Sequence, residues 1–295
     1  MPFIAIFIIL SAVAFFAWYD TYVRKQSFTS FNPHKQIFKK RLSPDQVNIL
    51  FKYSKYYKML PEKLKPYYEN RMLRFLKEKN FITKGEIHLT EEMKLLVADS
   101  AIKLTFGLKD YKFQKFPKII IFKGDFFSDF SKSQNKGETN PAGAIVFSWR
   151  DLLEGDANDM DGINLGLHEF AHALMIQNIG VSGWEDEYFL YKTELLYNFY
   201  NNSEKLDNVR THHLFREYAF RNEMEFFSVA IEHFFEGPHR IKSDLPELYS
   251  ILSRMLNQDT SRFYPVDKYF KKENINTEGQ KESGDSIPPD QPHQT

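Results

Sequence analysis

The pattern of apolar and polar residues divides the chain into an apolar start, a mostly helical body and a polar end. Residues 2–19 are apolar and carry no charged residue. Residues 266–295 contain almost no apolar positions and are predicted to be disordered. We therefore expect a membrane segment at 1–20, a linker at 21–42 and one folded domain at 43–265, followed by the tail.

Helical spacing of apolar residues dominates the body of the chain. Thr90 is predicted to cap a helix, because its hydroxyl can accept from a free N–H group and two glutamates follow it. Two β-branched runs, KIIIF and AIVFSW at 118–122 and 144–149, are typical of strands. Other helices are predicted over 43–79, where Pro61 and Pro66 separate two or three of them, and over 186–200, 217–235 and 245–256. The pattern predicts an α+β fold, predominantly helical, with a small sheet.

An acidic stretch at 151–162 resembles a calcium loop at first sight. The spacing does not fit, because in DANDMDG, residues 156–162, the fifth position is Met160, where a ligand is required, and the sixth is Asp161, where glycine is required. We interpret the stretch as a loop that enters the next helix, with Asp161 or Asn164 available to cap that helix.

The apolar start reads PFIAIFIILSAVAFFAWY and is long enough to cross a bilayer as one helix. A cleaved signal peptide is the alternative. However, no Lys or Arg precedes the apolar run, and Phe15 and Phe16 interrupt its small residues. Basic residues such as Arg24 and Lys25 follow the segment. We therefore expect a single-pass membrane protein whose folded domain faces the cytoplasm.

Composition restricts the chemistry that the chain can carry out. The chain has 295 residues, of which 42% are hydrophobic, and its formal net charge is zero. This balance argues against general electrostatic binding of nucleic acid. Cysteine is absent, which excludes disulfides, thiolate catalysis and cysteine-ligated metals. Any metal must therefore be held by His, Asp or Glu.

The stretch GLHEFAHALM, residues 166–175, carries the clearest chemical signal. Residues four apart on an α-helix lie about 40° apart around the axis and about 6 Å apart along it. His168 and His172 can therefore bind one metal ion. Glu169 lies beside that position, where its carboxylate can hold a water and accept its proton while the metal lowers the pKa of the water. The pattern predicts a zinc-dependent peptidase with Glu169 as catalytic base.

The alternative is that both histidines are ordinary helix residues. A pattern this short arises by chance in roughly 2 of 100 chains of this composition, so a third ligand is needed to support a metal site. The three-histidine form of the motif is excluded, because Met175 and Asn178 occupy its glycine and third-histidine positions.

The apolar stretch 218–236 offers a candidate for the third ligand. It is predicted to be one helix, on which Tyr218, Glu225 and Glu232 are each seven residues apart and lie within about 40° of one another. Carboxylates on such a helix are unfavourable to bury without a cation or hydrogen-bond partners. A metal facing them would explain their presence. The alternative is a polar strip that faces solvent, as on any amphipathic helix.

Taken together, these stretches resemble the Mlc titration factor A (MtfA) family of zinc-dependent peptidases. The resemblance covers about residues 43–263 and is carried by GAIVFSWRDLLEGDANDMDGINLGLHEFAHAL, YAFRNEMEFFSVAIEHFFEGP and LPELYSIL. It implies a largely helical, zincin-like metallopeptidase domain with a small sheet. It also implies activity like that of an aminopeptidase on short peptides.

The resemblance also implies roles for individual residues. One Zn2+ ion would be held by His168, His172 and Glu225, and Glu169 would be the catalytic base. Tyr218 would lie at the active site. The remaining acid of the second stretch, Glu232, would orient a ligand histidine from behind.

Two features depart from the family pattern. Met175 stands where members usually have aspartate, so any role of that aspartate must be lost or moved. The apolar start is the second departure.

We expect a membrane-anchored zinc peptidase that acts on a peptide or protein substrate. One alternative is a non-catalytic regulatory protein that uses the fold to bind a partner such as a transcriptional regulator. The other is an intramembrane protease, although the one charge-free span lies far from the motif.

Overall fold

The computed structural model describes residues 41–157, 162–178 and 184–262. The predicted membrane segment, most of the predicted linker and the predicted disordered tail lie outside these residues. Among the helices of the described ranges, none has the length and apolar character needed to cross a bilayer.

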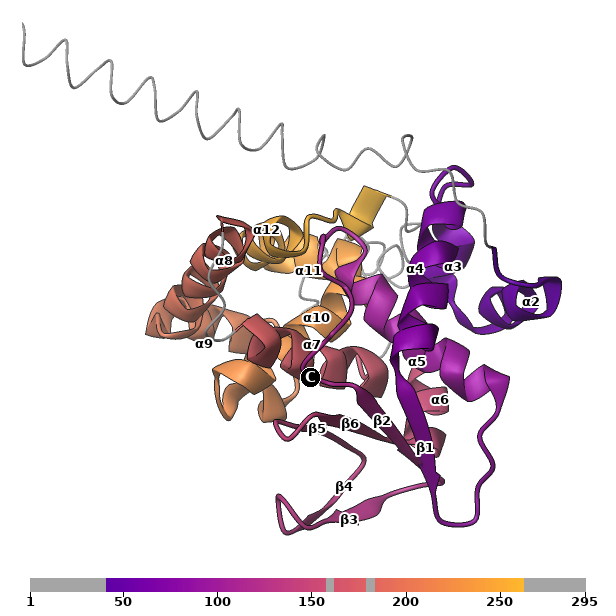
Figure 1. Cartoon of the computed structure of the whole chain (residues 1–295). Helices are drawn as coiled ribbons and strands as arrows, with labels where there is room; N and C mark the ends of the chain where they lie inside the picture. Colours follow the sequence, from indigo (N-terminus) through magenta and orange to yellow (C-terminus); the bar gives the residue numbers. More distant parts are fainter. Residues whose placement is uncertain (1–40, 158–161, 179–183, 263–295) are drawn as a thin grey trace, which may run out of the picture.

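The described part of the chain has an α+β fold in which helices predominate (Figure 1). Its helices, in chain order, are α2 (Pro44–Tyr53), α3 (Lys55–Met59), α4 (Lys65–Glu78), α5 (Glu91–Thr105), α6 (Trp149–Ala157), α7 (Leu165–Asn178), α8 (Trp184–Tyr200), α9 (Ser203–Thr211), the 3-10 helix η2 (Glu217–Phe220), α10 (Glu223–Glu236), α11 (Pro238–Asp244), α12 (Pro246–Leu256) and the 3-10 helix η3 (Thr260–Arg262). Its strands are β1 (Asn80–Lys84), β2 (Lys118–Phe122), β3 (Phe126–Ser128), β4 (Ser133–Asn135), β5 (Gly137–Asn140) and β6 (Ala144–Ser148).

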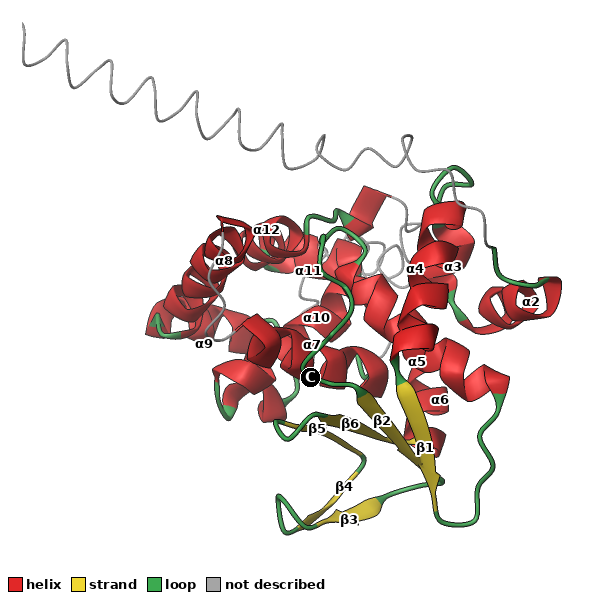
Figure 2. Cartoon of the chain, in the orientation of Figure 1, coloured by secondary structure: helices red, strands yellow, loops and turns green. Residues whose placement is uncertain are grey.

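A four-stranded sheet in the order β1-β2-β6-β5 supports the helices. The first three of these strands are parallel, and β5 lies antiparallel to β6 at the edge. The chain crosses from β1 to β2 through α5, which is the usual way to join parallel neighbours. Helices lie on one side of the sheet, and the hairpin β3–β4 projects from the other side (Figure 2). The two sides of β5 therefore face different surroundings.

Several local predictions are confirmed. Thr90 accepts from Met93 N at the start of α5. Asn164 caps α7, because its side-chain oxygen accepts from Leu167 N at 2.9 Å. Both predicted strands are present as β2 and β6, and three helices occupy the region divided by the two prolines.

Other predictions from the sequence are wrong. The acidic stretch was predicted to be a loop, but its first half belongs to α6. The single helix predicted over 217–235 is interrupted, because η2 ends at Phe220 and Asn222 caps a new helix, α10, through Glu225 N. The sequence analysis also missed β1, β3, β4, β5, α9, α11 and η3.

One hydrophobic core fixes the motif helix α7 in place. Phe170, fully buried on this helix, contacts the rings of Phe75, Phe113 and Phe147 at centroid distances of 5.0–5.9 Å. Met175, where the sequence departs from the pattern that the resemblance implies, is also buried in this core. Helix α10 packs against α7, and its buried apolar residues, including Phe226 and Ala230, belong to the same core. This packing orients the polar side chains that α7 and α10 direct toward each other.

Candidate metal centre

Helix α7 brings the two motif histidines onto one face. The Nε2 atoms of His168 and His172 lie 3.1 Å apart, and their ring centroids are 4.8 Å apart. Asn164 and the α10 contacts fix the start of this helix, and the buried Phe170 fixes its opposite face. The two ring nitrogens therefore point to a common position.

Helix α10 adds a carboxylate to this pair from its first turn. Glu225 Oε2 lies 3.1 Å from His168 Nε2 and 3.4 Å from His172 Nε2. The three atoms form a nearly equilateral triangle with edges of 3.1–3.4 Å. Tetrahedral zinc with ligands at about 2.0–2.1 Å requires ligand atoms about 3.3 Å apart. The triangle thus has the dimensions of three corners of a tetrahedral site.

The chemistry of these donors also fits a metal. Among the described residues, His168, His172 and Glu225 are the group of metal-ligating side chains whose donor atoms lie close enough to share an ion. Glu225 Oε2 is buried and has no aligned hydrogen-bond partner in the described part of the chain, although two nitrogens lie near it. This geometry is expected when the oxygen and the two nitrogens all direct their lone pairs at a common metal position and not at one another. Two imidazoles and a carboxylate are a common catalytic zinc ligand set.

A second carboxylate on α10 holds His168 from behind. His168 Nδ1 donates to Glu232 Oε1 at 2.6 Å, which leaves Nε2 free for a metal. Glu232 is completely buried and also accepts from Asn164 N at 2.8 Å. Arg216 donates to both oxygens of Glu232, at 2.7 and 3.0 Å, and to Gly162 O. The arrangement is the one expected for a residue that orients a ligand histidine.

The carboxylates give the site a strong preference for positive charge. Burial lowers the pKa of His168, but the neighbouring carboxylates of Glu225 and Glu232 outweigh burial and raise this pKa to about 10. Burial raises the pKa of Glu225, but the two histidines lower it by more. The net pKa lies below the usual value for a glutamate, so the carboxyl stays ionised. Three carboxylates, those of Glu169, Glu225 and Glu232, lie around the two histidines, and the guanidinium of Arg216 pairs with Glu232. Glu169 and Glu225 therefore leave negative charge beside the histidines that a bound cation would offset.

The predicted base, Glu169, points toward the edge strand β5. Thr139 Oγ1 donates to Glu169 Oε2 at 2.9 Å and to Glu169 O at 2.8 Å. Burial raises the pKa of the Glu169 carboxyl, opposed by His172, His168 and the Thr139 hydrogen bond. Gly137 makes room for this carboxylate, because a Cβ at that position would lie 2.4 Å from Glu169 Oε1. The edge strand therefore sets the position of the base.

Tyr218 reaches the site from a different element than the sequence predicted. It belongs to η2 and not to α10, so the seven-residue spacing does not explain its position. Its ring still lies 5.9 Å from the His168 ring, and the guanidinium of Arg221 lies 4.6 Å from its ring centroid. Burial and the neighbouring Glu225 raise the pKa of Tyr218, so its hydroxyl remains a donor at neutral pH.

The structure brings all six predicted site residues into one region and adds three that the sequence analysis missed. These three are Arg216, Thr139 and Gly137. None belongs to a local motif, and each acts through a contact between elements distant in the chain. For Arg216, a partial signal was available, since a buried Glu232 requires hydrogen-bond partners.

Comparisons with known proteins agree with this geometry. The sequence model of the glucose-regulated metallo-peptidase M90 family matches residues 28–256. An uncharacterized protein of Synechocystis, slr2042, is 24% identical over 244 residues, covering 75% of this chain and 86% of the relative. Mlc titration factor A of Pectobacterium atrosepticum is 26% identical over 213 residues, covering 63% and 76%. The corresponding protein of Yersinia pestis is 29% identical over 134 residues, covering 43% and 49%.

The family match spans most of the chain, including both helices that supply the candidate ligands. It confirms the resemblance to the MtfA family that the three sequence stretches indicated. A metal is the cofactor that a metallopeptidase family implies, and the His168, His172 and Glu225 donors fit one. The chain belongs to the glucose-regulated metallo-peptidase M90 family.

Proposed function

We propose that this chain is a zinc-dependent peptidase with a zincin-like catalytic domain. The observation that carries the proposal is the triangle of His168 Nε2, His172 Nε2 and Glu225 Oε2, with edges of 3.1–3.4 Å beside a buried Glu169. Zinc bound there would supply Lewis acidity that lets a water lose a proton near neutral pH.

Glu169 is the residue that we propose to hold and move the proton. Its carboxyl has a raised pKa, which brings it closer to the range in which a general base works well at neutral pH. The hydrogen bond from Thr139 fixes Oε2, so Oε1 remains available to accept the proton of a water and later donate it to the leaving amine. Gly137 leaves the space in which that oxygen lies.

We propose that Tyr218 stabilises the charge that develops on the carbonyl oxygen of the substrate. Its hydroxyl stays protonated at neutral pH and its ring lies 5.9 Å from the ring of His168, so it can donate a hydrogen bond to an oxyanion. Glu232 and Arg216 take no part in proton transfer in this scheme. They hold the His168 ring in the orientation that ligation requires.

The experiment that tests the function combines metal content with turnover. Purified full-length protein should contain one zinc ion per chain and cleave peptides. Glu169→Gln should retain zinc and lose turnover, whereas Glu225→Ala should lose zinc. Glu223→Ala, in the same turn of α10 but outside the triangle, is the matched control. Full activity in Glu169→Gln, or undiminished zinc in Glu225→Ala, would refute the proposal.

The type of cleavage needs its own comparison. The sequence resemblance implies an aminopeptidase-like activity, so peptides with a free amino terminus should be cleaved at their first bond. The same peptides with an acetylated amino terminus should then resist cleavage. Cleavage of both sets at internal bonds would instead assign an endopeptidase.

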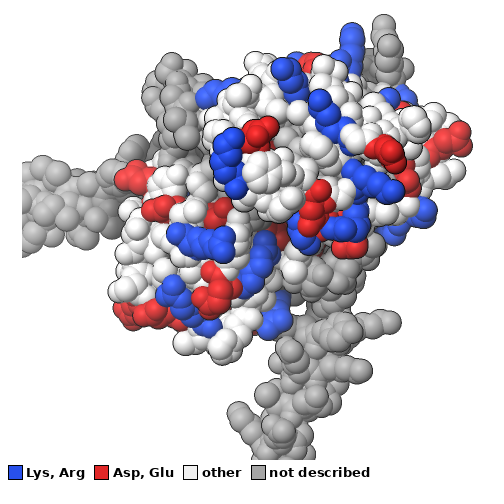
Figure 3. Space-filling view, turned by 90° about the horizontal axis from the view of Figure 1, so that it is seen from below, with Lys and Arg blue, Asp and Glu red and all other residues white. Residues whose placement is uncertain are grey.

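We further propose that residues 2–19 anchor the protein in a membrane, with the domain in the cytoplasm. The support is the charge-free apolar run followed by basic residues. The face of the domain in Figure 3 carries acidic and basic side chains interspersed, which does not favour nucleic acid as a partner. Resistance to alkaline extraction from membranes, together with protease sensitivity only in inverted vesicles, is the expected result.

A regulatory function is the second candidate. The support is the name of two of the relatives, Mlc titration factor A, which describes a titration factor and not an enzyme. The chain retains Glu169 in a position suited to catalysis, which favours the peptidase. A Glu169→Gln variant that preserves all biological activity in a deletion strain would favour the regulatory function.

A further inference from the structure

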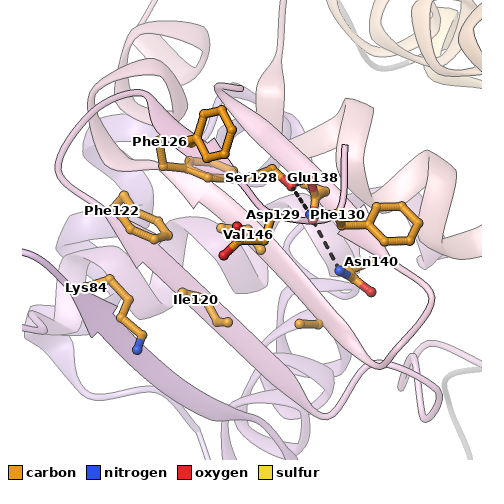
Figure 4. A pocket seen from close by; sticks show the side chains of 12 residues that line it. Lys84, Ile120, Phe122, Phe126, Ser128, Asp129, Phe130, Glu138, Asn140 and Val146 are labelled. Carbon is orange, nitrogen blue, oxygen red and sulfur yellow. Dashed lines mark hydrogen bonds between the residues drawn. The ribbon is translucent and has the colours of Figure 1, made fainter. Parts of the chain in front are cut away.

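A pocket lies on the side of the sheet opposite the candidate metal centre. It has a volume of about 220 Å³, is open to solvent on one side, and is lined by residues of the sheet and of the hairpin β3–β4 (Figure 4). Its floor is apolar and includes Ile120 and Val146, and the stacked rings of Phe122 and Phe126, 4.7 Å apart, form one wall. Phe130 also lines it, on the side where β5 lies, and its side chain is 64% exposed.

Strand β5 is shared by this pocket and the candidate metal centre. Gly137 and Thr139 face α7, because the first adjoins the Glu169 carboxylate and the second donates to it. Glu138 and Asn140 line the pocket on the opposite side. Side chains of a strand alternate between the two faces of a sheet, so one short strand reaches both sites.

The outer edge of β5 has backbone groups directed away from the sheet. Ser148 N donates to Lys136 O at 2.7 Å, and Gly143 N donates to Asn140 O at 3.0 Å. In an antiparallel pair, hydrogen-bonded positions alternate. The N–H and C=O groups of Gly137 and Thr139 therefore point outward. Within the described residues, no strand pairs with this edge.

We propose that the pocket is a specificity site that accepts an apolar side chain, of aromatic size, from a peptide whose backbone pairs with the outer edge of β5. This inference rests on the proposed peptidase function. A peptide paired with β5 must place alternate side chains on the two faces of the sheet. When one residue of the peptide faces Glu169 and the ligand histidines, its neighbour faces Phe130 and the pocket.

The chemistry of the pocket favours an uncharged occupant. Both acidic residues of its lining, Glu138 and Asp129, already have partners. Glu138 accepts from Ser128 Oγ, from Asn140 Nδ2 at 3.3 Å and from Asn135 Nδ2 at 3.2 Å. Asp129 forms an ion pair with Lys132 at 3.6 Å. Lys84 lies at the far side, away from β5 (Figure 4). Burying an apolar side chain against an exposed ring such as Phe130 is favourable in proportion to the area removed from water.

Binding can be measured separately from cleavage in the full-length Glu169→Gln protein, loaded with zinc and kept in detergent micelles. The probes are fluorescein-labelled peptides of glycine and serine that carry a single Phe, Ala or Asp, moved along the peptide one position at a time. Fluorescence anisotropy gives each dissociation constant. At one position, Phe should bind about tenfold more tightly than Ala, and Asp no better than Ala.

The preference for Phe is the ratio of the dissociation constants of the Ala and Phe peptides. Phe130→Ala should reduce this ratio to less than about a third of its original value, because the ring that contacts the Phe side chain is removed. The residue is exposed and its backbone N–H still reaches Ser128, so the variant should fold. The matched control is Phe51→Ala, an exposed phenylalanine on α2, which should leave the preference unchanged.

The proposal is overturned if no position prefers Phe, if no peptide binds, or if Phe130→Ala keeps the full preference. It also fails if the protein forms dimers, if Phe130→Ala dissociates these dimers, and if the Phe peptide leaves them intact. In that case the pocket is part of an interface between two copies of the chain. Failure of the peptidase function gives a different result. In that case, the Glu169→Gln protein binds the Phe peptide with the expected preference, and the wild-type protein does not cleave it.

Discussion

The contact between Gly137 and Glu169 allows the position of the base to be changed with little effect on the fold. A methyl group at residue 137 would lie 2.4 Å from Glu169 Oε1 and 2.6 Å from Leu165 Cδ1. Non-bonded carbon contacts require about 3.5 Å. Gly137→Ala should therefore displace the Glu169 carboxylate by about 1 Å.

The effect on catalysis should be much larger than the effect on stability. Both clashing atoms are ends of flexible side chains, so the backbone can stay in place. The free energy of unfolding should fall by about 1 kcal/mol, the value of the Thr139 hydrogen bond that the displacement weakens. A displacement of 1 Å at a catalytic group can reduce the rate by about 100-fold.

The assay compares kcat/KM, zinc content and urea unfolding in Gly137→Ala and wild type. Gly124→Ala is the control, because the nearest atom to its added methyl lies at an ordinary 3.5 Å. We expect a loss of kcat/KM of about 100-fold with one zinc ion retained. Unchanged kcat/KM would refute the role assigned to β5. Loss of zinc would show that the strand acts on the ligands and not on the base.

Three further predictions concern the surroundings of the site. Arg216→Met should weaken zinc affinity by about 10- to 100-fold in a chelator competition, because Glu232 loses its guanidinium partner, and Arg216→Lys should restore part of it. Burial lowers the pKa of His233 to about 4. Since this is below the unfolded value of about 6.5, the unfolded chain binds more protons and stability should decrease as the pH falls from about 6.5 to 4. Urea unfolding at pH 7.5 and 5 should show a smaller decrease in His233→Phe, which keeps the ring stacked on Phe215. Phe170→Ala should lower the free energy of unfolding by about 3–5 kcal/mol in urea, with the same m-value.

The parts of the fold that the sequence predicted are those governed by local rules. Thr90 and Asn164 precede helices with side chains that can cap them, and the β-branched runs at 118–122 and 144–148 form the strands β2 and β6. The spacing of His168 and His172 is likewise local, since one turn of helix is enough to place them together.

The features that the sequence analysis missed depend on contacts between distant segments. Strand β5 reads GETN, with no apolar alternation, and forms because β6 and α7 lie beside it. The break between η2 and α10 was missed because Asn222, a capping residue, was interpreted as part of a continuous helical face. The role of Arg216 depends on the burial of Glu232, which the sequence alone does not show.

The placement of the third candidate ligand on α10 has a consequence for biosynthesis. The ribosome completes α7 well before it completes α10, so a newly made chain presents His168 and His172 without Glu225. Two imidazoles alone hold an ion less firmly than three converging donors. Tight loading must then await the docking of the later helix, and a truncated product that ends before residue 223 would compete poorly for the scarce zinc of a cell.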